Sequence, residues 1–185
     1  MSKRTKIKKG FYMIEAIIAL FLISTGLLVA VDLMTSVSIN TTRDRDNIIA
    51  AMLAQEGLEI VRNVRDNNFA IGDTAFANGF PAASSDNCRV SNIATTSVGI
   101  TCDGSYVINL TGAKLYASAA GDSTKFQRRI SIRYITIGAT DYAKVTSVVT
   151  WKGNVTSISI NNVASECIAE NGCAYTQTNF TRWIE

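Results

Sequence analysis

Apolar residues dominate the chain directly after a short basic segment. From Phe11 to Val31 the only charged residue is Glu15. The 21 residues of this run would form a helix of about 32 Å, which matches the roughly 30 Å hydrocarbon core of a bilayer. The pattern predicts a basic leader at residues 1–10 and a membrane-spanning helix over residues 11–34.

The helix is predicted to continue beyond the membrane as an amphipathic segment, residues 35–66. After the polar stretch at 38–47, apolar residues recur at spacings of three, four and seven, which is the pattern of one helix face. These residues are Ile49, Met52, Leu53, Ile60, Val61 and Val64. No proline precedes Pro81, and the asparagines after Asp66 favour a helix end.

Strand patterns dominate residues 67–185, the predicted extracytoplasmic globular domain. An irregular connection is expected up to residue 104, followed by a short strand at 105–110. Three further strands are separated by short turns and predict an antiparallel meander; they lie at 127–137, 142–151 and 155–160. The apolar helical stripe is the natural cover for this sheet. The predicted fold class is therefore α+β, with a long N-terminal helix packed on an antiparallel β-sheet.

Alternation along the strand at 127–137 separates an apolar face from a polar one. The apolar face carries Ile130, Ile132 and Tyr134, and the polar face carries Arg129, Ser131 and Arg133. The arginines, which neighbour Arg128, are expected to lie on a solvated sheet face.

The charge of the chain is concentrated at its start. Five of the 18 basic residues fall in the first ten positions, which contain no acid, so 13 basic residues remain against 15 acidic ones. The domain therefore lacks the basic surface that is typical of nucleic-acid binding.

The residue types present exclude several kinds of catalysis. The chain has no histidine, which excludes Ser-His-Asp and Cys-His catalysis and the commonest zinc ligand sets. The glycines form neither a dinucleotide fingerprint nor a phosphate-binding loop. Carboxylate chemistry would fall to residues such as Glu166, next to Cys167, and Glu170, between Cys167 and Cys173, and neither needs a catalytic role. We expect no enzymatic activity, no cofactor and no metal.

Four cysteines follow the membrane segment: Cys88, Cys102, Cys167 and Cys173. An even number downstream of a membrane span favours two disulfides outside the cytoplasm. Local pairing, Cys88 with Cys102 and Cys167 with Cys173, is the preferred arrangement. Four cysteines allow three pairings, and four reduced thiols are the remaining alternative.

Glu15 is the residue in the apolar run that most needs an explanation. In an ordinary signal anchor it would extend toward the membrane surface, and in a signal peptide the cleavage site would lie near Ala30, where the sequence suits it poorly. A cut between Gly10 and Phe11 would explain the position of Glu15 better, because it creates an α-amine one helical turn before the glutamate. The amine of a neighbouring chain that is shifted along the helix axis would pair with Glu15 better than the amine of the same chain does. Such a pair would select the partner chain and the register of the two helices.

The residues KKG followed by FYMIE, positions 8–15, resemble the type III signal of prepilins. The segment Ile14–Leu28 is similar to the corresponding helix of minor pilins and pseudopilins. Tyr12 and Met13 depart from the commoner Thr-Leu pair but keep its apolar character. Asp32 stands where major pilins often carry a proline, which favours a minor pilin or pseudopilin, although it also suits the outer edge of a membrane.

This resemblance implies a structural subunit of a type IV pilus or a pseudopilus-like filament. Prepilin peptidase would cut after Gly10 and N-methylate Phe11, and Glu15 would be the assembly glutamate. The expected partners are other pilin or pseudopilin subunits and an inner-membrane assembly platform; the charge balance gives no support for a nucleic-acid partner, which stays open. The chain would first cross the cytoplasmic membrane once, with its C-terminal domain outside, and then join a surface or periplasmic filament. Pili, secretion pseudopili and competence filaments all remain open.

The main alternative is a signal-anchored extracytoplasmic binding module that does not polymerise. Trp151, Phe180 and Trp183, together with the loops, would then form its ligand-binding face. Packing in the core or the tail is the simpler expectation for each of these aromatic residues.

Overall fold

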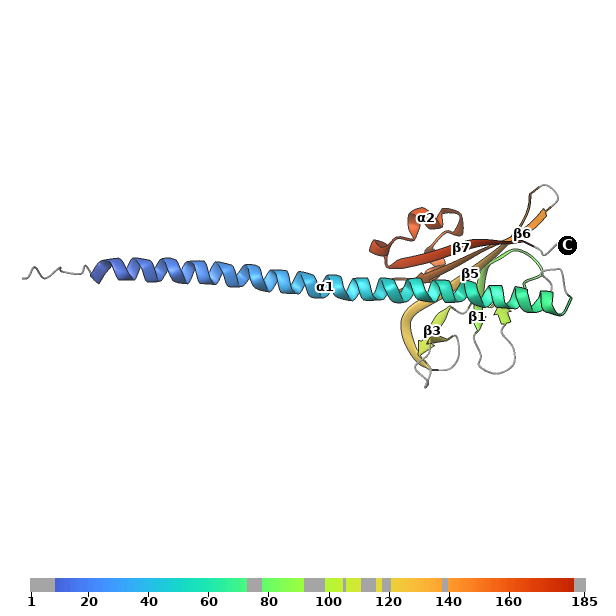
Figure 1. The fold of residues 1–185 in the computed structure, drawn as a ribbon, viewed down its shortest axis with the longest axis horizontal. Helices are drawn as coiled ribbons and strands as arrows, with labels where there is room; N and C mark the ends of the chain where they lie inside the picture. Colours follow the sequence, from blue (N-terminus) through green and yellow to red (C-terminus); the bar gives the residue numbers. More distant parts are fainter. Residues whose placement is uncertain are drawn as a thin grey trace, which may run out of the picture. The chain divides into compact units, whose positions relative to one another are not determined.

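A computed structural model of the chain describes residues 9–72, 78–91, 99–104, 106–110, 116–117, 121–137 and 140–181. Most of the predicted leader lies outside these residues. The chain divides into two compact units, Met1–Asp44 and Arg45–Glu185. The long helix α1, Lys9–Ala70, contributes to both units (Figure 1).

Helix α1 continues one turn beyond the predicted end at Asp66. Asn68 is buried, and its side-chain amide donates a 2.6 Å hydrogen bond to the carbonyl of Asn78. This tertiary contact keeps the asparagines in the helix, although asparagine by itself favours turns. The chain leaves the helix at Gly72, whose φ of 82° suits glycine.

The described part of the second unit contains seven strands, joined by antiparallel pairing. The strands are β1 (Ser85–Ser91), β2 (Gly99–Thr101), β3 (Val107–Leu110), β4 (Tyr116–Ala117), β5 (Asp122–Ile137), β6 (Thr140–Thr150) and β7 (Cys173–Thr181). The long strand β5 pairs with β6 on one side and with β1 and β3 on the other. The predicted α+β class, a long helix with an antiparallel sheet, is confirmed.

One face of the sheet packs against the part of α1 that follows residue 45 (Figure 1). The helix buries Ala50, Leu53, Ala54, Leu58, Ile60, Val61 and Val64. The predicted apolar stripe is therefore confirmed at most of its positions, and Met52 is the exception because it is 64 % exposed. Gly57 allows the close approach: a β-carbon there would lie 2.7 Å from the Ser147 hydroxyl oxygen.

The prediction of a strand at 155–160 was wrong. The 3-10 helices η1 (Val155–Ser157) and η2 (Ile160–Asn162) occupy this region, followed by α2 (Val163–Glu166) and η3 (Ala169–Asn171). The Asn154 side chain caps η1 by accepting a hydrogen bond from the backbone N–H of Thr156. The edge of β6 is taken instead by β7, which pairs along its whole length. An alternating sequence therefore forms no strand where another segment fills the available edge.

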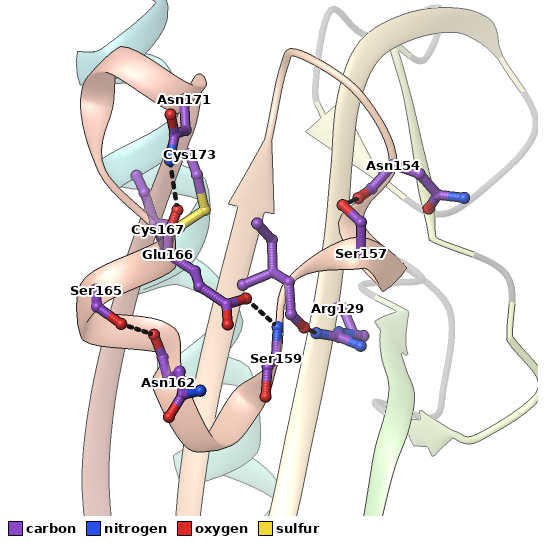
Figure 2. The surroundings of a disulfide bond; sticks show 12 residues. Arg129, Asn154, Ser157, Ser159, Asn162, Ser165, Glu166, Cys167, Asn171 and Cys173 are labelled. Carbon is purple, nitrogen blue, oxygen red and sulfur yellow. Dashed lines mark hydrogen bonds between the residues drawn. A yellow bond between two sulfur atoms is a disulfide. The ribbon is translucent and has the colours of Figure 1, made fainter.

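The expectation of a solvated arginine face was also wrong. The segment 154–172, here called the cover, packs on the sheet face opposite α1, where Val148, Val155, Val163 and the Cys167–Cys173 disulfide form a small core. Arg129 is only 5 % exposed beneath the cover and donates a hydrogen bond to the carbonyl of Ile158 (Figure 2). Burial by the cover converts a face that alternation marks as solvated into an interior one.

Both disulfides have the preferred local pairing. Cys88 bonds to Cys102, and Cys167 bonds to Cys173. The first ties β1 to the segment after β2, and the second joins the end of the cover to the start of β7 (Figure 2).

Candidate functional site

The part of α1 before residue 45, which includes the predicted membrane half (residues 11–34), exposes nearly all of its side chains. Between Tyr12 and Asp44 every side chain is exposed except that of Thr25, which is half-buried. By length and composition α1 is the one described helix able to cross a membrane, with a mean hydropathy of 2.5 over an 18-residue window that is 0 % buried. A helix that is apolar on all sides needs apolar surroundings, and this chain supplies none within the described residues. The helix is long and apolar enough to anchor the chain in a membrane.

Most hydroxyl groups before residue 45 donate hydrogen bonds to the backbone of their own helix. Ser24 and Thr25 donate to the carbonyl of Phe21 at 2.9 and 3.0 Å. Thr35, Thr41 and Thr42 each donate to the carbonyl four residues earlier. Such hydroxyls need no partner outside the helix, which makes them tolerable in an apolar environment.

The charged groups are different, because they have no such internal partner. From Tyr12 to Thr42 the only charged residues are Glu15 and Asp32, and both are exposed. No ion pair among the described residues involves either carboxylate. Glu15 lies inside the apolar run and Asp32 directly follows it, so Glu15 is the carboxylate whose burial in a membrane would most need a cation from outside the described chain.

The backbone at the predicted cleavage site is helical. Gly10, Phe11 and Glu15 all lie within α1. Four residues of helix separate Phe11 from Glu15 by about 6 Å along the axis and about 40° around it. The Phe11 nitrogen and the Glu15 side chain therefore lie on one side of the helix, one turn apart.

A buried arginine on the helix-facing side of β5 is the feature that the sequence patterns did not reveal. Arg128 is 2 % exposed and donates a 3.0 Å hydrogen bond to the carbonyl of Leu53 in α1. Glu56 lies 3.5 Å from the same guanidinium, and burial lowers the pKa of Arg128 against the opposing effect of Glu56. The isolated glycine Gly57 was the available signal, because glycine inside an amphipathic helix often marks a close contact.

A second ionic cluster joins β1 to the cover. Arg133 bonds the Asp86 carboxylate through two nitrogens, and the Ser131 hydroxyl donates to the same carboxylate at 2.6 Å. The hydrogen bond from Arg133 holds the pKa of Asp86 below its ordinary value, and the same bond raises the pKa of Arg133. Arg133 also bonds Asn161 of the cover. The cluster is satisfied within the domain, as expected of a structural contact.

Of the residues considered for catalysis or ligand binding, Glu170 is exposed, and Glu166, Trp151 and Phe180 have structural roles. Glu166 accepts a 2.7 Å hydrogen bond from the backbone N–H of Ser159 inside the cover (Figure 2). Trp151 and Phe180 are 8 % and 3 % exposed, so they belong to the core. Trp183 lies outside the described residues. Within the described ranges, no group of three or more acidic, cysteine or histidine side chains is placed to hold a metal ion.

Comparison of the chain with models of protein families, with curated proteins and with solved structures finds no match. Function is therefore inferred from the apolar helix and its two acidic residues.

Proposed function

We propose that this chain is a structural subunit of a type IV pilus or pseudopilus-like filament, with a minor pilin or pseudopilin as the favoured kind. The observation that carries the proposal is the membrane half of α1, which exposes apolar side chains all round and places Glu15 one turn after Phe11. The similarity of positions 8–15 to the prepilin signal supports the same conclusion.

Cleavage between Gly10 and Phe11 by prepilin peptidase converts a membrane precursor into an assembly-competent subunit. The new α-amine on Phe11, which the peptidase N-methylates, is a cation at the start of an apolar helix. Paired with Glu15 of a neighbouring chain, it neutralises both charges when the two helices are parallel and shifted by about 6 Å. Leaving either charge unpaired in an apolar bundle costs about 3–5 kcal/mol, so pairing selects the correct neighbour and register.

Apolar packing between the membrane halves supplies most of the association energy. The filament grows open-ended because a head-to-tail contact between copies does not close on itself. Energy for assembly comes from a separate motor, since the sequence has no nucleotide-binding motif. Assembly takes place on an inner-membrane platform, and the domain formed by residues 67–185 is extracytoplasmic.

Intact-mass measurement of the protein isolated from cells that contain prepilin peptidase tests the processing step. The expected chain begins at Phe11 and carries one added methyl group. Gly10→Leu is the matched variant and should keep the leader. A mature chain that begins at Met1, or one that is cut near Ala30, would contradict the proposal and support the anchored binding module.

Incorporation into filaments tests the role of the Glu15 charge. Glu15→Gln should be processed normally and recovered poorly in sheared or pulled-down filaments. Glu59→Gln, on an exposed part of the same helix, is the control and should be incorporated like wild type. Equal incorporation of both variants would remove the charge-pairing mechanism.

A further inference from the structure

Pairing of Glu15 with the Phe11 amine of a neighbouring chain leaves Asp32 as the second acidic residue of this part of α1, still without a cation. Asp32 lies 17 residues after Glu15 in α1, about 25 Å along the axis, and is exposed. The nearest basic residue that follows it is Arg43, 11 residues further along the helix and about 16 Å away. Within its own helix, therefore, Asp32 has no cation in reach.

The Ser36 hydroxyl differs from those of the neighbouring threonines because it makes no hydrogen bond to the helix backbone. The hydroxyls of Thr35, Thr41 and Thr42 bond the helix backbone. Among the hydrogen bonds of the described residues none involves the exposed side chain of Ser36. Its hydroxyl can therefore donate to a group outside its own helix.

The spacing of these residues matches the proposed pairing at the other end of the membrane half. Phe11 and Asp32 are 21 residues apart, and Glu15 and Ser36 are also 21 residues apart. A four-residue stagger that brings the Phe11 amine of one chain level with Glu15 of its neighbour also brings Asp32 of the first chain level with Ser36 of the second. The two contacts require the same shift, about 6 Å.

The angular positions agree as well. Twenty-one residues are three heptads, so residues at this spacing return to one seam when parallel helices supercoil gently to the left. In straight helices the drift would be about 60° over three heptads, which would turn the two residues away from each other. One seam between two staggered copies can therefore hold both contacts when the helices supercoil to the left, and the proposed contact includes this supercoil.

We infer that Asp32 of one copy accepts a hydrogen bond from the Ser36 hydroxyl of a second, staggered copy, forming a second register contact about 31 Å from the Glu15 contact. The partner is another copy of this chain, and the inference rests on the proposed filament function. The pairing gives the Asp32 carboxylate a partner and uses a serine hydroxyl that, like that of Ser38, makes no hydrogen bond among the described residues. Hydrogen bonds to charged groups are the stronger kind, which suits a contact that fixes register.

Cysteine cross-linking between two co-expressed copies of the full chain tests the contact directly. One copy carries Asp32→Cys and the other carries Ser36→Cys; all described native cysteines are in disulfides. Oxidation of isolated filaments should give the mixed dimer in at least about tenfold excess over the dimer of two Asp32→Cys copies, which only an unstaggered pair would form. Preferred linkage between two Asp32→Cys copies, or of Asp32→Cys to Ile39→Cys, would overturn the inference.

A double-mutant comparison gives a second test. It measures incorporation into filaments with the Ser36 hydroxyl present or removed. Asp32→Asn should lower incorporation by about tenfold, and Ser36→Ala should then cause little further loss in the Asp32→Asn background. Independent, multiplying losses would overturn the inference. Thr35→Val is the control, because its hydroxyl bonds its own helix.

The outcomes separate this inference from the proposed function. If wild-type chains begin at Phe11 and assemble while neither the cross-link nor the coupled loss is seen, the filament function stands and the Asp32–Ser36 contact fails. If wild-type chains keep residues 1–10 and form no filament, the proposed function fails and the contact fails with it.

Discussion

Removal of the Cys167–Cys173 disulfide should destabilise the domain at a calculable cost, with the cover still packed on the sheet. The double variant Cys167→Ala/Cys173→Ala avoids leaving a free thiol. The bridge spans a sequence separation of 6, for which loop-closure entropy corresponds to about 2.2 kcal/mol at 25 °C. The same calculation for Cys88–Cys102, with a separation of 14, gives about 3.0 kcal/mol. The shorter bridge should therefore be the less costly one to remove.

Urea unfolding of the full chain in detergent micelles measures both losses. A Trp183→Phe background leaves Trp151 as the single tryptophan, since the chain has two, and Trp151 is buried in the core. The free energy of unfolding should fall by about 2 kcal/mol for the cover disulfide and by about 3 kcal/mol for the β1 disulfide. If losing the shorter bridge costs as much as losing the longer one, loop entropy does not determine how much the Cys167–Cys173 disulfide adds to the free energy of unfolding. Packing of the cover then determines it, and the reasoning is refuted.

Two further predictions concern contacts inside the domain. The hydrogen bond from Arg133 depresses the pKa of Asp86, so its stabilising effect is present above the ordinary aspartate pKa and is lost as pH falls through the depressed one. The urea midpoint of wild type should therefore drop more steeply below about pH 4 than that of Asp86→Asn; parallel curves would contradict this. The ring centroid of Phe180 lies 4.7 Å from the guanidinium carbon of Arg65, and Phe180 is buried. Phe180→Leu should cost about 1–2 kcal/mol in urea unfolding, and Phe180→Tyr should cost less because it keeps the aromatic ring.

Periodicity predicted the elements whose pattern is long and whose surroundings are uniform. The apolar run after Phe11 and the stripe that includes Leu53 and Val61 specify a helix regardless of tertiary contacts, because 3.6-residue spacing persists over many turns. The alternation at 127–137 likewise specified a strand. The structure extends this strand back to Asp122, where β3 pairs with its first residues.

Short patterns failed where another segment competed for the same position. The alternation at 155–160 is as strand-like as that of its neighbours, yet β7 occupies the edge it would need. Arg129 was assigned to solvent because alternation reports which residues share a face and not what covers that face. Met52 fits the helical spacing but lies beyond the edge of the contact with the sheet.

The sequence by itself determined the candidate site, because the site is local. Gly10, Phe11 and Glu15 are related by helix geometry alone, and one turn of helix has the same dimensions in any fold. Only the tertiary structure decided which cysteines meet, that segment 154–172 covers the far face of the sheet, and that Arg128 reaches the backbone of α1 across 75 residues of sequence. These contacts depend on which surfaces are buried against each other, and the spacing of apolar and polar residues does not specify that outcome.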